Sequence, residues 1–124
     1  MTAGRGIIHS ELPHDEFQKI GGRTHGFQIW VNLPKEHKMM EPRYQELPAS
    51  VSPTVERNGV WARVIAGECM DVSSSIDTII PISLIHVKME ENTELTQQLD
   101  YELNSMIYVF SGKVTIDNEV FVKK

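Results

Sequence analysis

Hydrophobic and polar side chains alternate along much of this chain, and a period of two is typical of β-strands. In residues 26–33 every second side chain is apolar, which would place one face of a strand on a core. That face holds Phe27, Ile29, Val31 and Leu33, and the other holds Gln28, Trp30 and Asn32. Residues 60–66 repeat the pattern, with Val60, Ala62, Val64 and Ala66 opposite Trp61, Arg63 and Ile65. We therefore predict two half-buried strands.

Turn residues between apolar runs predict two tight hairpins. Asn58-Gly59 directly precedes the second strand, and this dipeptide is a strong hairpin signal because both residues tolerate positive φ. We therefore expect residues 54–57 to pair with residues 60–63. A second hairpin is predicted about Asp117-Asn118, between residues 114–116 and 120–122.

The other periodic segments are short. Strands are predicted at residues 82–89 and 106–110, a bend at Gly112, and a short helical turn within residues 90–99. Many short strands with frequent turn signals indicate an all-β sandwich or barrel. By contrast, residues 34–53 contain four prolines and little periodicity. They predict an extended connector between two unequal β pieces, because proline fixes φ and removes a backbone donor.

Composition narrows the classes of function. The chain has 124 residues, of which 40% are hydrophobic, and its formal charge is −5, which argues against direct nucleic-acid binding. No stretch approaches the roughly 18 apolar residues of a membrane helix, and no secretory signal is visible, so we expect a cytoplasmic protein away from membranes. The single cysteine, Cys69, cannot form an intrachain disulfide. A metal site would therefore use histidine, aspartate or glutamate.

The most informative candidate for chemistry is the pair His9 and Glu11. If residues 6–11 form a strand, the two side chains point to the same face, and both could ligate one divalent metal. Two imidazoles and a carboxylate suit non-haem Fe(II), so this pair supplies part of such a site. The alternative is a hydrogen-bonded surface pair.

The other histidines and the cysteine favour structural roles. His14 follows Pro13 in a predicted loop, where it is either a solvated residue or a third ligand. His86 shares a strand face with Ile82 and Leu84, which indicates a histidine at the edge of the core. Cys69 has no histidine close to it in sequence and is expected to be an inert, packed thiol.

Three segments resemble the pirin family closely: residues 1–11 (MTAGRGIIHSE), 25–34 (HGFQIWVNLP) and 38–45 (KMMEPRYQ). From about Ala49 onward the likeness is looser but continues in register. The resemblance implies a bicupin, in which two β-barrels share one chain and the N-terminal barrel holds one metal, usually iron. In the family three histidines and one glutamate hold that metal. Carried over to this sequence, His9 is the third histidine and Glu11 is the carboxylate.

The resemblance also implies what this chain lacks. The family's other two ligands come from an earlier His-x-His motif, and Met1 matches a position after it. In the second half, counting back from Gly112 places the corresponding positions at Leu99 and Tyr101, or at Gln98 and Asp100, and none is histidine. We therefore expect residues 1–48 to be a remnant of the N-terminal cupin plus the connector. Residues 49–124 are expected to be the first part of a metal-free C-terminal cupin.

These expectations give an all-β fold of cupin-like (double-stranded β-helix) pieces whose incomplete barrels are completed by a homodimer or higher oligomer. Three functions remain open. The chain is a pirin-like fragment without catalytic activity; or an iron-dependent dioxygenase of the quercetin type, with a site completed by another chain; or a protein-interaction module of the transcriptional co-regulator kind. Iron is a possible cofactor through His9 and Glu11, and a metal-free protein is the alternative.

Overall fold

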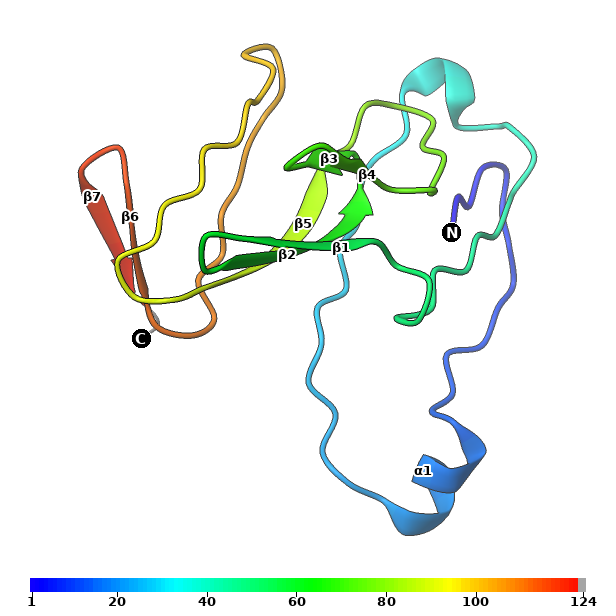
Figure 1. Cartoon of the computed structure of the whole chain (residues 1–124). Helices are drawn as coiled ribbons and strands as arrows, with labels where there is room; N and C mark the ends of the chain where they lie inside the picture. The colour runs from blue at the N-terminus through cyan, green and yellow to red at the C-terminus, as the bar shows by residue number, and fades with distance from the viewer. Residues whose placement is uncertain (123–124) are drawn as a thin grey trace. The chain divides into compact units, whose positions relative to one another are not determined.

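The computed structural model describes residues 1–122. Two compact units follow one another along the chain, Met1–Glu94 and Leu95–Lys124. The elements, drawn in Figure 1, are a helix α1 (Asp15–Ile20), a 3-10 helix η1 (Lys35–His37), and strands β1 (Thr54–Arg57), β2 (Val60–Ala66), β3 (Glu68–Cys69), β4 (Val72–Ser73), β5 (Leu84–Met89), β6 (Lys113–Ile116) and β7 (Glu119–Val122). The expected division after residue 48 concerns the barrels of the family and stays a prediction.

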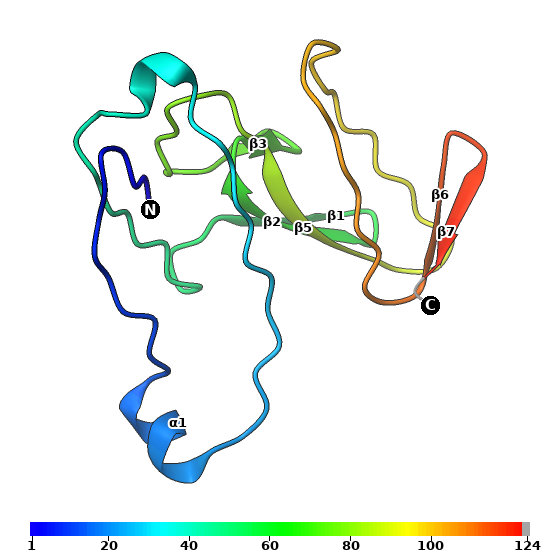
Figure 2. The same cartoon turned by 180° about the vertical axis from the view of Figure 1, so that it is seen from behind.

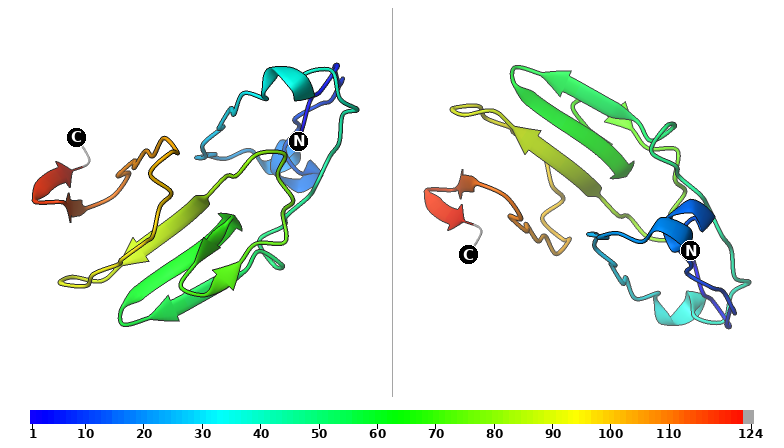
Figure 3. Two further views of the ribbon diagram at one scale, coloured as in Figure 1. Left: turned by 90° about the horizontal axis from the view of Figure 1, so that it is seen from above. Right: turned by 90° about the horizontal axis from the view of Figure 1, so that it is seen from below.

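The first unit is built on an antiparallel sheet in the order β1-β2-β5, whose strands lie side by side in Figure 3. The β1–β2 hairpin has the predicted register, with Thr54 opposite Arg63 and Arg57 opposite Val60. The turn between them has φ of 51° at Asn58 and 75° at Gly59. Two positive φ angles make the turn that best fits the twist of paired strands, which confirms the prediction from Asn-Gly.

The core lies on one face of this sheet. Val60, Ala62, Val64 and Ala66 are all at most 4% exposed, and the intervening residues of β2 are half-buried, so the predicted alternation is confirmed. Strand β5 begins two residues later than predicted, and the β2–β5 register shifts between Val64 and Ala66.

A two-residue hairpin that the sequence did not predict, β3–β4, follows the sheet. Its turn has positive φ at Met70 (48°) and Asp71 (63°), residues that carry no Asn-Gly signal.

The predicted strand at residues 26–33 is wrong. The segment has no regular secondary structure, and Phe27, Ile29 and Val31 are each more than half exposed. Figures 1 and 2 show it as an extended trace that returns from α1. A strand requires a neighbouring backbone to accept and donate its hydrogen bonds, and residues 26–33 form no β-bridge with another segment of the described chain. In the described chain the predicted strand at residues 106–110 does not form, and residues 90–99 contain a turn at residues 91–92 but no helix.

The predicted connector, residues 34–53, carries no strand but contains η1. Arg43 ties it to the N-terminal segment and to the loop between β4 and β5. Arg43 and Thr2 exchange two backbone hydrogen bonds of 2.8 and 3.0 Å. Its guanidinium donates to the Asp77 carboxylate at 2.7 Å and to the Asp77 carbonyl at 2.6 Å. Gln45 donates to the same carbonyl and accepts from the Asp77 backbone N–H. This connector is therefore anchored rather than free.

The second unit contains the β6–β7 hairpin, which confirms the other predicted turn. Asp117 and Asn118 have φ of 47° and 66°, and Gly112, with φ of 77°, makes the predicted bend. Every described residue of β7 is exposed.

Most of the regular elements are strands in small antiparallel sheets, and the helices are short, so the all-β class is confirmed. Within residues 1–122 no strands close into a barrel. Over the same residues, no helix is long and apolar enough to cross a membrane.

Candidate functional site

The side chains of His9 and Glu11 meet on the surface of the first unit. His9 Nε2 lies 3.3 Å from Glu11 Oε1. Their side chains are 38% and 65% exposed, and neither residue belongs to a helix or strand. The distance lies at the long end for a hydrogen bond, and exposed pairs of this kind contribute little to stability. The pairing therefore leaves both side chains available to other ligands.

A third side chain, Gln28, joins this pair from a segment 17 residues away. Its Nε2 donates to the same Glu11 Oε1 at 3.3 Å. The alternating pattern predicts Gln28 on the polar side of a strand and gives it no part in a site. The alternation in residues 26–33 indicates which face of the segment Gln28 lies on, but nothing in the sequence indicates that this face contacts Glu11.

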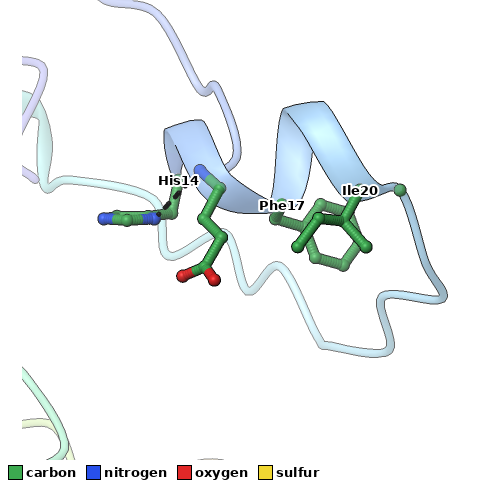
Figure 4. Close-up of a pocket in the computed structure, with 5 residues that line it drawn as sticks. His14, Phe17 and Ile20 are labelled. Atoms are coloured by element: carbon green, nitrogen blue, oxygen red, sulfur yellow. Dashed lines mark hydrogen bonds between the residues drawn. The ribbon is translucent and has the colours of Figure 1, made fainter.

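The helix α1 uses His14, which was a candidate third ligand. Its Nδ1 accepts from the Glu16 backbone N–H at 3.3 Å, so it caps the helix. Together with Glu16, Phe17, Ile20 and Gly21 it lines a shallow hollow, shown in Figure 4. His14 itself lies in the loop before the helix, as expected, but the helix that follows was not predicted. Acidic residues in the first turn, Lys19 in the last and Gly21 after it favour this short helix.

The remaining histidines lie elsewhere. His25 packs against the Phe27 ring with centroids 5.8 Å apart, His37 lies in η1, and His86 lies on β5 beside Trp61. Across residues 1–122, no three His, Cys, Asp or Glu side chains gather closely enough to hold a metal ion. Non-haem Fe(II) sites of the facial-triad kind use two histidines and one carboxylate. His9 and Glu11 with an amide beside them do not fit a resident iron within one chain, and the metal role of the pair stays a prediction.

Cys69 is buried at the end of the short strand β3, with 1% exposure. Burial raises the pKa of its thiol. A protonated, inaccessible thiol is a poor nucleophile, so the prediction of a packed cysteine is confirmed.

Comparison with known proteins identifies one group of relatives. The chain is 41% identical over 112 residues to pirin-like protein 2 of Arabidopsis thaliana, which covers 90% of this chain and 33% of that protein. It is 39% identical over 116 residues to the pirins of Rattus norvegicus and Homo sapiens, covering 94% of this chain and 38% of each. The chain thus spans little more than a third of these curated relatives. No family model and no solved structure matches it.

Proposed function

This chain corresponds to a segment of a pirin-family protein, and we propose that by itself it has no metal-dependent catalytic activity. The observation that carries the proposal is the donor set on the surface: one imidazole, one carboxylate and the amide of Gln28.

Metal affinity depends on how firmly the ligands are held in place as well as on their number. A working metal site fixes its ligands through hydrogen bonds to residues around them, and losing such partners costs about 10- to 100-fold in affinity. Here Glu11 Oε1 is shared by His9 and Gln28, and all three residues are exposed. A metal held by this pair would compete with water at most of its coordination positions. Binding would therefore be weak and its geometry loose.

Iron retention tests the proposal. The purified chain is exposed anaerobically to Fe(II), passed through a desalting column, and measured for iron per chain and for oxygen uptake with quercetin. We expect iron far below one per chain and no uptake above that of Fe(II) alone. The variants His9→Ala and Glu11→Gln should leave both readings unchanged. One iron per chain that is lost in His9→Ala but kept in His37→Ala would overturn the proposal.

A second candidate is a metal site completed by another copy of the chain. It is favoured by the exposed apolar residues of segment 26–33, since an exposed alternating segment that forms no strand in this chain can add to a strand of a second molecule. Gln28 of that segment touches Glu11, so association there would bring a second chain beside the pair. Such a homodimer would be the setting for quercetin-type dioxygenase chemistry in this family.

Native mass spectrometry separates the two candidates, because it reports subunit number and bound metal together. A dimer that holds iron in a fixed ratio supports the shared site. A monomer, or a metal-free dimer, supports a segment without catalysis.

A further inference from the structure

One face of the β1-β2-β5 sheet carries a cluster that the metal hypothesis does not use. We call it the cationic face, and it consists of Trp61 and Arg63 on β2 with His86 and Lys88 on β5. Arg63 pairs with His86 and Trp61 with Lys88 in the β2–β5 register. Because side chains alternate along β2, this cluster points away from the side on which Val60, Ala62 and Val64 are buried.

The Trp61 ring organises the cluster. Lys88 Nζ lies 5.0 Å from the ring centroid and the Arg63 guanidinium carbon lies 5.4 Å from it. The His86 ring meets Trp61 edge-on, with centroids 5.4 Å apart and an interplanar angle of 82°. Cation–π contacts of this kind hold both cations in place, so less side-chain entropy is lost when an anion binds.

The positive charge of this face is not neutralised. In the described chain, neither Arg63 nor Lys88 takes part in an ion pair, whereas Arg5, Arg43 and Arg57 each do. Arg63 Nε is buried and has no hydrogen-bond partner among residues 1–122.

The titratable neighbours of the two cations leave a surplus of positive charge. Burial, then Lys88 and Arg63, lower the pKa of the His86 imidazole, so it is neutral at pH 7. The register places one carboxylate on the same face, Glu56 opposite Trp61. The face therefore carries two positive charges and one negative charge, on a chain whose net charge is −5.

We propose that the cationic face binds an acidic peptide segment of a protein partner, with carboxylates at alternate positions. Arg63 and Lys88 are diagonal neighbours on adjacent strands, a placement that separates side chains by about 7–8 Å. An extended peptide rises about 3.3 Å per residue, so its residues i and i+2 lie about 7 Å apart on one side. A Glu-x-Glu segment therefore matches both cations at once. The proposal is independent of the metal pair and of catalysis.

The arrangement of the Trp61 ring argues for a peptide and against a nucleic acid. Base recognition on single strands uses aromatic faces that are free to stack. Here Arg63 and Lys88 already lie over the Trp61 ring. A lone phosphate would engage one cation well, whereas two carboxylates on one backbone engage both.

Fluorescence anisotropy of a labelled peptide of alternating glutamate and serine, titrated with the whole chain at low salt, tests the proposal. Arg63→Gln and Lys88→Gln should each weaken binding by about two- to fivefold, and the double variant by about tenfold. Glu56→Gln should strengthen it, because a competing carboxylate is removed. Arg57→Gln is the matched control: it removes an arginine from the same sheet, but one already paired with Asp71, and it should change affinity by less than about twofold. Circular dichroism checks that each variant is folded.

Four results would overturn the proposal. The first is no saturable binding of the peptide, and the second is an equal loss of affinity in Arg57→Gln. The third is displacement of the labelled peptide by inorganic phosphate at the same concentration at which unlabelled peptide displaces it. The fourth is tighter binding of a single-stranded oligonucleotide of equal charge.

Sedimentation of the chain alone shows whether it self-associates. Self-association that is abolished by Lys88→Gln would also overturn the proposal, because the occupant of the cationic face would then be a second copy of this chain.

Discussion

Replacing Val64 with alanine tests whether the small β1-β2-β5 sheet is the folded core of the first unit. Val64 is fully buried in the middle of β2. The substitution removes about two methylene equivalents, or roughly 1.6 kcal/mol of transfer free energy. The cavity left in a close-packed site adds to this, so we expect a loss of about 2–3 kcal/mol in the free energy of unfolding. For a small domain that is a large fraction of the total.

Val31→Ala is the matched control, because it makes the same chemical change at a side chain that is 52% exposed. Only about half of the transfer term applies there and no cavity forms, so the expected loss is below about 1 kcal/mol. Urea unfolding followed by far-ultraviolet circular dichroism gives both values. It should be run at two protein concentrations, because association at residues 26–33 would make the cost of Val31→Ala depend on concentration.

Equal costs for the two variants at low concentration would refute this reasoning. Segment 26–33 would then be buried in the monomer as the hydrophobic alternation alone predicts. A cost at Val64 below about 1 kcal/mol would instead mean that the sheet contributes little to stability.

Three further predictions follow from single residues. Gly59→Ala should cost about 1–2 kcal/mol in chemical unfolding, because φ is 75° and a Cβ would lie 2.7 Å from Thr93 Cγ2; Gly26→Ala, with open space around it, should be near neutral. The Cys69 thiol should react slowly with a disulfide reagent in the native protein and fast in urea, because it is buried and its pKa is raised; rapid native labelling would contradict the burial. Because the folded state lowers the pKa of His86, the unfolded state binds the extra proton, and stability should fall as the pH drops through about 6.5. Thermal unfolding of His86→Asn should show a smaller loss over that range, and an identical pH profile would count against it.

The functional interpretation depends on two separate surfaces of the first unit. The His9–Glu11 pair is the surface on which the proposal about metal and catalysis is tested. The cationic face relates to binding and needs no metal. Testing the two with different variants keeps their outcomes independent.

Local patterns predicted the hairpins well, because a hairpin forms between neighbours in sequence. Asn58-Gly59 set the β1–β2 register and Asp117-Asn118 set the β6–β7 register, since both turns depend only on which residues tolerate positive φ. The alternation in β2 likewise predicted its buried face residue by residue. Weak local signals failed: the β3–β4 turn lacks a glycine at its centre, and α1 has only six residues over which to show a period.

By itself, the sequence determined the all-β class, the two tight turns and the buried face of β2. His9 and Glu11 lie close together although residues 6–11 do not form the strand from which their common face was predicted. The tertiary structure decided that Gln28 hydrogen-bonds to Glu11 and that Arg43 hydrogen-bonds to Asp77. It also decided that two cations from different strands lie over the Trp61 ring, and that residues 26–33 form no strand. Alternation shows which side of a segment is apolar, but a strand forms only where a second backbone supplies hydrogen bonds, and contacts between distant residues depend on chain closure that no local pattern encodes.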